Sequence, residues 1–414
     1  MFQSLLGLVT LLGLAMALSE RRGLIPWRLV AGGLGLQVAI AAFMLKAPFL
    51  RGAFMALNAL VAAMDEATRA GTAFVFGYLG GAPAPFAVTD PGATFSLAFQ
   101  ALPLVIVIAA LTALLYYWNI LPHVVRGFSL VLEKTMGIGG VLGVGAGGCV
   151  FLGMIEAPLL IRPYMERMTR SELFAMMATG MSCIAGTMLI LYATVLKGII
   201  PDALGHILTA SVIHAPAALV VAALMIPETK EPTLGRVLPR SPASGAMDAV
   251  VSGTADGLRL FGSIVATLLV FVALVKLANI LLGTLPAVGG APVTLERGLG
   301  LVMAPVAWLL GVPWAEAATA GSLLGTKIVL NEFIAFLDMA KLPAGALSEH
   351  TRLILTYAMC SFANFGSVGI LLAGMGSLCP ARKDEITALG GRALVAGALA
   401  SLMTGTVVGI LASF

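Results

Sequence analysis

The stretches GMIEAPLLIRPY (Gly153–Tyr164) and KIVLNEFIAFLD (Lys327–Asp338) each place a glutamate inside an apolar run bounded by glycine and proline. An ionised Glu156 or Glu332 at the centre of a bilayer would cost roughly 2.5–3.5 kcal/mol, so such a residue is expected only where a cavity or a ligand uses it. Because the two glutamates lie in corresponding halves of the chain, they predict the central binding site of a membrane transporter.

The composition supports this interpretation. The chain has 414 residues, of which 59% are hydrophobic and only 11% are charged. A soluble domain carries about a quarter charged residues. Apolar runs long enough to cross about 30 Å of hydrocarbon recur from end to end. The sequence therefore predicts an all-α polytopic membrane protein.

Eight segments are predicted to span the membrane: residues 3–18, 29–46, 99–119, 171–196, 207–226, 250–282, 345–376 and 388–412. Two further apolar stretches, 138–163 and 302–336, are rich in glycine and interrupted by charge, which favours re-entrant helical hairpins over simple spans. The segment Gly52–Thr68 has the pattern of an interfacial amphipathic helix.

The first apolar run, Phe2–Leu18, is interpreted as a retained helix. It has no basic region before it, and Glu20, Arg21 and Arg22 follow it in place of a small-residue cleavage site. Lysine and arginine are in excess on the side of the membrane that holds Arg21 and Arg22. This bias predicts an inner-membrane protein with both termini outside the cytoplasm.

That orientation puts the two hairpins on opposite sides of the membrane, so the halves are predicted to be an inverted repeat. In support, Glu156 precedes CIAGT (Cys183–Thr187) much as Glu332 precedes NFGSV (Asn364–Val368). Two broken helices and two hairpins that meet at mid-membrane would direct helix ends and unpaired backbone groups at one cavity.

Four stretches carry a family resemblance: GMIEAPLLIRPY, TGMSCIAGT (Thr179–Thr187), LLGTKIVLNEFIAF (Leu323–Phe336) and CSFANFGSVGI (Cys360–Ile370). Together they resemble the signature stretches of concentrative nucleoside transporters, in the same order along the chain. The resemblance implies a homotrimer whose protomers have eight transmembrane helices, two opposed re-entrant hairpins, and a transport domain that moves against a scaffold. It also implies nucleoside import driven by a sodium or proton gradient, with no cofactor.

On this resemblance the chain divides into four parts. Residues 1–137 are expected to form N-terminal helices and the interfacial helix, largely as scaffold. Residues 138–226 would be the first repeat, with hairpin and two helices, in the transport domain. Residues 227–298 would hold a linker and a long scaffold helix, and residues 299–414 the second repeat.

The same resemblance assigns the binding residues. Glu332, Asn364 and Ser367 match the polar residues that hold the ribose hydroxyls, and Phe362 matches the aromatic beside the sugar. The chemistry fits, because a carboxylate accepts two hydroxyl donors while Asn and Ser both donate and accept. The rest of the substrate-binding wall is assigned to Met154, Ile155, Glu156 and Met188.

The base end of the site departs from the family pattern. Members usually carry a polar pair before the first glutamate, whereas this chain has Met154 and Ile155. Only Glu156 remains there to hydrogen-bond a base edge directly. Two interpretations stay open: an altered substrate preference, or ordinary packing at the hairpin tip with base recognition left to water or backbone.

The candidate cation site departs as well. The resemblance places it at Glu156, Cys149, Leu152, Cys183 and Ile184. Sodium-coupled members have asparagine where this chain has Cys149, and serine or threonine where it has Cys183. Thiols are poor ligands for sodium, although the backbone carbonyls of Leu152 and Ile184 remain. The sequence therefore favours proton coupling over sodium coupling.

The roles of two charged residues stay open at the level of the sequence. Glu156 could bind the base, carry the proton or do both, or it could form a structural ion pair with Arg162 or Lys327. Lys327 could cap a hairpin helix or neutralise a buried charge.

The function also has competing interpretations. A same-fold transporter of another ribosyl or sugar-like solute is the alternative to a nucleoside importer. An intramembrane enzyme is disfavoured, because the sequence has no HExxH or GxSxG motif, and a P-loop for ATP-driven transport is also missing.

Overall fold

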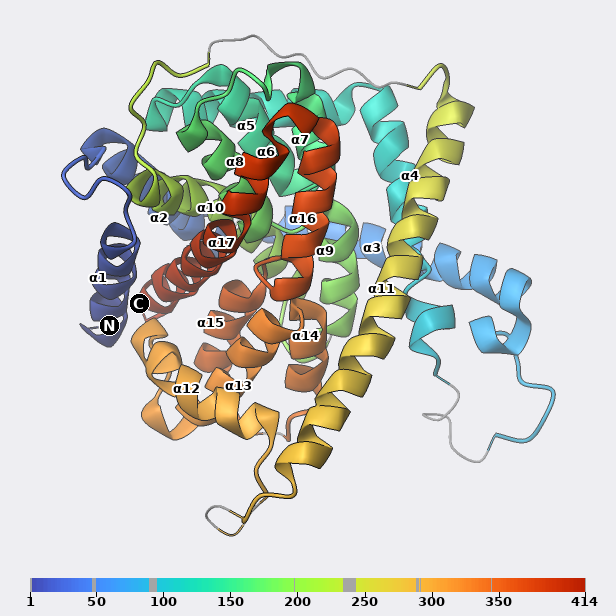
Figure 1. The fold of residues 1–414 in the computed structure, drawn as a ribbon. Helices are drawn as coiled ribbons and strands as arrows, with labels where there is room; N and C mark the ends of the chain where they lie inside the picture. Colours follow the sequence, from blue (N-terminus) through green and yellow to red (C-terminus); the bar gives the residue numbers. More distant parts are fainter. Residues whose placement is uncertain are drawn as a thin grey trace.

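All the elements described are helices, as the apolar runs predict (Figure 1). The structure is a computed structural model that describes residues 2–46, 50–88, 95–196, 198–233, 243–287, 290, 292–343 and 345–413. The N-terminal helices are α1 (Phe2–Ala17) and α2 (Trp27–Lys46). They pack against α17 (Lys383–Leu411) and α10 (Ala203–Met225), so the two termini lie side by side.

The predicted interfacial segment 52–68 lies within a longer helix, α3 (Leu50–Phe76). It is followed by the short helix η1 (Gly77–Gly80). α3 begins behind the main bundle, where it contacts α10, and its end and η1 extend to one side (Figure 1). Next come η3 (Leu97–Ala101) and α4 (Leu104–Tyr117), and α4 packs along the 37-residue helix α11 (Ala246–Leu282).

The rest of the chain contains two series of helices in the same order: a helix pair, a broken helix and one long helix. The first series begins after α5 (Ile120–Met136) and comprises α6 (Gly140–Phe151), α7 (Glu156–Leu160), α8 (Arg170–Ser182), α9 (Gly186–Val195) and α10. The second comprises α13 (Trp314–Val329), α14 (Glu332–Lys341), α15 (Glu349–Met359), α16 (Phe365–Leu378) and α17. The short helices η4 (Arg162–Tyr164) and η5 (Pro380–Arg382) precede α8 and α17.

The stretch 138–163, which was predicted to be a hairpin, contains the helix pair α6–α7, whereas the stretch 302–336, which was predicted to be one hairpin, contains two turns. That stretch contains α12 (Leu295–Leu310), which is bent by 115° relative to α13. Gly311 causes this turn with a φ of 112°, and Pro313 follows it. A second break, at Leu330 and Asn331, separates α13 from α14. Glu332 therefore lies at the second turn of the stretch.

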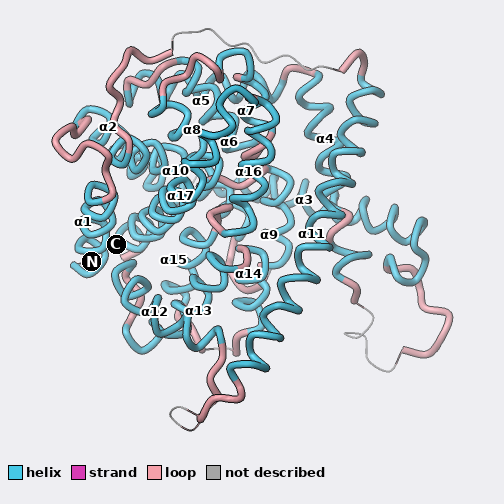
Figure 2. Tube along the Cα trace, viewed as in Figure 1, coloured by secondary structure: helices cyan, strands magenta, loops and turns pink. Residues whose placement is uncertain are grey.

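The two broken helices lie next to each other at the centre of the fold (Figure 2). The first break separates α8 from α9 and the second separates α15 from α16. Gly397 of α17 lies against both: a Cβ atom there would be 2.7 Å from the Cβ atom of Met181 and 3.3 Å from that of Ala363. Small residues thus allow the two breaks to approach closely.

Among the described residues, six helical segments are long and apolar enough to cross a membrane. They are Trp27–Leu45, Leu97–Tyr117, Arg170–Val195, Ala203–Met225, Ala246–Leu282 and Pro380–Leu411. The predicted first span is the shorter apolar helix α1, and the predicted span 345–376 is broken into α15 and α16. The protein is thus a multi-pass membrane protein.

The contact between α4 and α11 leads to a testable prediction. A Cβ atom at Gly257 of α11 would lie only 2.7 Å from the Cα atom of Ile106 in α4. Gly257→Leu should therefore destabilise the protein by about 1–3 kcal/mol through overpacking. Gly262→Leu is the matched control, because nothing lies within 4 Å of a Cβ atom at Gly262. Thermal unfolding in detergent measures the difference, and equal melting temperatures would contradict the described packing.

Candidate functional site

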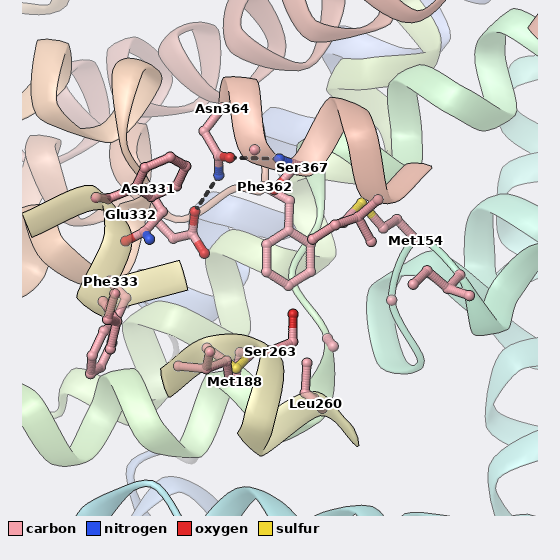
Figure 3. A pocket seen from close by; sticks show the side chains of 18 of the residues that line it. Met154, Met188, Leu260, Ser263, Asn331, Glu332, Phe333, Phe362, Asn364 and Ser367 are labelled. Atoms are coloured by element: carbon pink, nitrogen blue, oxygen red, sulfur yellow. Dashed lines mark hydrogen bonds between the residues drawn. The ribbon is translucent and has the colours of Figure 1, made fainter. Parts of the chain in front are cut away.

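A cavity of ≈ 280 Å³ lies where the two helix pairs and the two broken helices meet α11 (Figure 3). All eight residues that the sequence assigned to substrate binding line it: Met154, Ile155, Glu156, Met188, Glu332, Phe362, Asn364 and Ser367. These residues come from four segments of the chain. The structure therefore brings the predicted set together, while the role of each residue stays a prediction.

Glu332 is held by hydrogen bonds on both carboxylate oxygens. Tyr192 of α9 donates its hydroxyl to Oε1 at 2.5 Å. The Asn364 side chain donates Nδ2 to Oε2 at 2.9 Å (Figure 3). The glutamate is the first residue of α14 and is only 3% exposed. Each oxygen has capacity for a further donor, so the carboxylate can accept hydroxyl groups from a ligand.

The orientation of Asn364 is fixed by its place in the chain. It is the N-cap of α16, where its Oδ1 accepts a hydrogen bond of 2.8 Å from the backbone N–H of Ser367. Its Nδ2 is thereby left to reach Glu332. The helix cap and the contact with Glu332 use opposite ends of one amide group.

Glu156 has a different environment. It is the first residue of α7, and it is exposed on the cavity surface, in contrast to the buried Glu332. Within the described residues, no side chain donates a hydrogen bond to its carboxylate. The alternative of an ion pair with Arg162 or Lys327 is not among the ion pairs of these residues. Glu156 is therefore the freer of the two carboxylates.

Helix N-termini gather around the cavity. α7, α14 and α16 all begin there, at Glu156, Glu332 and Phe365. The N-terminus of a helix carries about half a positive charge and unpaired N–H groups. These ends favour the two carboxylates and polar ligand groups near them.

The remaining wall is largely apolar, and part of it was missed by sequence reasoning. α11 contributes Leu260, Ser263, Ile264, Leu268 and Phe271. Figure 3 shows the Ser263 hydroxyl pointing into the space below Phe362. Asn331 and Phe333 beside Glu332 were also missed as lining residues. Ser263 was the available signal on α11, since it is a polar residue within an apolar run.

Tyr192 is a further residue that the sequence did not identify. It is 0% exposed, and its ring lies near those of Phe333 and Phe336, with centroids 6.1 and 5.3 Å away. A buried tyrosine hydroxyl requires a partner, which was the available signal. Its partner Glu332 is 140 residues away in the sequence, so only the tertiary structure reveals the pair.

The four candidate cation residues besides Glu156 do not line the cavity. Cys149, Cys183 and Ile184 are fully buried, and the Cys183 thiol lies 3.8 Å from the carbonyl oxygen of Ser211. Two hydroxyls near this break, Ser182 Oγ and Thr187 Oγ1, are buried without a hydrogen-bond partner among the described residues. No group of three or more His, Cys, Asp or Glu side chains in that part of the chain could hold a metal ion.

Comparisons with known proteins agree with this arrangement. Residues 6–79 and 206–409 match the models for the N-terminus and C-terminus of Na+ dependent nucleoside transporters, and residues 98–198 match a model described as nucleoside recognition. The nucleoside permease NupC of Helicobacter pylori is 33% identical, over 98% of this chain and 97% of its own. The chain belongs to the concentrative nucleoside transporter family.

Further relatives extend the likeness. The uncharacterized transporter YutK of Bacillus subtilis is 38% identical, over 98% of each chain. The solved structure of CNTnw in an inward-facing substrate-bound state matches with a TM-score of 0.90 and 34% identity, covering 100% of this chain and 98% of CNTnw. The concentrative nucleoside transporter resemblance seen in the sequence is thus confirmed. The protein is a transporter and not an enzyme.

The Tyr192–Glu332 contact can be tested by mutation. Tyr192→Phe removes a buried hydrogen bond to a charged acceptor, so it should lower stability by about 1.5–3 kcal/mol. Tyr116→Phe is the control, because the Tyr116 hydroxyl on α4 has no hydrogen bond among the described residues. Thermal unfolding of the two variants in detergent measures this, and a Tyr192→Phe melting temperature equal to that of the control would exclude the contact.

Proposed function

We propose that the protein is a secondary active importer of nucleosides across the inner membrane, coupled to a cation gradient. The single observation that carries this proposal is the Glu332 carboxylate, held by Tyr192 and Asn364 at the wall of a cavity. Its remaining acceptor capacity suits two neighbouring hydroxyl groups of a ribose. Family membership supports the substrate class. The alternative is a transporter of another ribosyl or sugar-like solute.

The proposed membrane arrangement has eight transmembrane helices and two re-entrant hairpins, α6–α7 and α13–α14. The halves would be inverted in the membrane, with both termini outside the cytoplasm. The repeated order of hairpin, broken helix and long helix in the two series supports an inverted repeat.

Transport is proposed to follow an elevator-type movement within a homotrimer. The cavity has α11 as one wall, and α11 packs mainly against α4. These two helices suit a fixed scaffold. The predicted division at 137, 226 and 298 is kept with one change: α1 and α2 are assigned to the moving domain, because they pack against α10 and α17. Structures of CNTnw in inward-facing and outward-facing states, with TM-scores of 0.90 and 0.91, support alternating access.

In the proposed substrate pose, the ribose lies against Glu332, Asn364 and Ser367, with Phe362 beside the sugar. The base would then point toward Met154, Ile155 and Glu156, across from Met188. Because Met154 and Ile155 offer no polar side-chain atoms for base hydrogen bonds, Glu156 is the main polar contact proposed there. This pose favours recognition of the sugar over recognition of the base.

The nucleoside proposal can be tested by counterflow in proteoliposomes. We expect preloaded unlabelled nucleosides to exchange with a labelled nucleoside, and free bases without ribose to exchange poorly. A 2′,3′-dideoxynucleoside should compete at least about tenfold less well, because it has no ribose hydroxyls that could donate hydrogen bonds to the Glu332 carboxylate. Exchange of ribosides other than nucleosides, with no nucleoside exchange, would favour the alternative function instead.

The coupling ion is proposed to be the proton, with Glu156 as its carrier. Cys149 and Cys183 supply sulfur where sodium would prefer oxygen. Sodium is the alternative, supported by the family description and by the Ser182 and Thr187 hydroxyls, which have no hydrogen-bond partner in the described part of the chain.

Separate gradients distinguish the two ions. We expect an inward proton gradient to drive nucleoside accumulation at zero sodium, and an inward sodium gradient at equal pH to drive little. Glu156→Gln should abolish the proton-driven accumulation but leave nucleoside exchange measurable. Accumulation driven by sodium alone would contradict proton coupling. In that case Ser182→Ala and Thr187→Val would show whether their hydroxyls bind sodium.

A further inference from the structure

Lys327 is a buried cation that the proposed transport mechanism leaves without a role. It lies in the last turn of α13, five residues before Glu332, and its side chain is only 2% exposed. It is not among the residues that line the cavity. A charged lysine inside a membrane domain is costly, so it is expected to have a compensating partner.

The neighbours of Lys327 identify that partner. Its ammonium group forms no hydrogen bond and no direct ion pair among the described residues. Glu332 begins α14 just after the break at Leu330 and Asn331, five residues beyond Lys327, and it is buried as Lys327 is. The groups that contribute to the electrostatic environment of Lys327 include this carboxylate, Cys360 in the break between α15 and α16, and His214 of α10. Glu332 is the one carboxylate in this set. Lys327 and Glu332 therefore form a pair of opposite charges across the break between α13 and α14.

His214 is suited to a neutral role beside this pair. It is 0% exposed, and its Nε2 atom donates a hydrogen bond of 3.2 Å to the carbonyl oxygen of Tyr357. Since Nε2 then carries the hydrogen, Nδ1 is an acceptor. Nδ1 has no partner among the described residues. A neutral imidazole with a free acceptor is compatible with an adjacent ammonium group.

The ends of α13 and α14 also stabilise the charges of Lys327 and Glu332. Lys327 lies at the C-terminal end of α13, and Glu332 begins α14. A cation at a helix C-terminus and an anion at a helix N-terminus are each stabilised by the helix dipole. The break at Leu330 and Asn331 thus keeps the two charges apart, and each faces a favourable helix end.

We propose that Lys327 is a positioning residue: it supplies the counter-charge that keeps Glu332 a charged acceptor for the hydroxyl groups of the substrate. This inference rests on the proposed nucleoside function. Because Lys327 does not line the cavity, it acts on the substrate only through Glu332. Tyr192 and Asn364 hold the carboxylate in place, and Lys327 provides the charge that those two neutral groups cannot provide.

The test compares Lys327→Met, which removes the charge with little change in shape, with Lys327→Arg, which keeps it. The KM of uptake is measured for a nucleoside and for its 2′,3′-dideoxy analogue. We expect Lys327→Met to raise the nucleoside KM about tenfold and to leave the dideoxy KM within about twofold, because only the hydroxyls bind the carboxylate. Lys327→Arg should restore most of the discrimination. A fall in Vmax for both solutes with an unchanged KM ratio would overturn the proposal.

A second measurement does not depend on the substrate. Melting temperatures in detergent are compared for Lys327→Met, Glu332→Gln and the double variant. If the two charges compensate each other, the double variant should recover stability that Lys327→Met loses. Additive losses would overturn the pairing. If wild type exchanges no nucleoside but this recovery is observed, the proposed function fails while the charge pair stands.

Discussion

The Glu332 carboxylate connects the parts of this fold that do not follow one another in the sequence. Its oxygens receive hydrogen bonds from Tyr192 of α9 and from Asn364 at the start of α16, and it begins α14 itself. A carboxylate that is 3% exposed in a membrane domain requires such donors. The broken helices provide them, because only an interrupted helix presents a cap residue such as Asn364 in the middle of the bundle.

The need of a buried carboxylate for hydrogen-bond donors also explains why the two ends of the cavity differ. Glu332 has hydrogen-bond donors on both oxygens, whereas Glu156 is exposed to the cavity and has apolar neighbours in Met154 and Ile155. A pre-organised polar end gives strong orientation to a ligand. The opposite end, which is apolar apart from the Glu156 carboxylate, adapts more easily to different ligand groups. This asymmetry is the basis of the proposed pose, in which the sugar lies at the Glu332 end and the base at the Glu156 end.

The proposed elevator-type movement depends on which helices form the wall of the cavity. Most of its lining comes from the two repeats, but one wall comes from α11, which packs chiefly against α4. Gly253 and Gly257 allow α11 to approach the backbone of α4 closely. In the proposed elevator-type movement, a site formed between two such bodies would change its exposure when one body slides past the other, without rearrangement of the hydrogen bonds around Glu332.

The sequence by itself determined the membrane class, most helical segments, the family and eight residues that line the cavity. Long apolar runs have few alternatives to helices in a bilayer, and a glutamate within such a run indicates a site. The sequence predicted a single hairpin over 302–336 and missed that Gly311 and Pro313 turn the chain before the break that carries Glu332. Only the tertiary structure identified Tyr192 and the α11 wall. These depend on contacts between residues distant in the chain, and local periodicity contains no information about such contacts.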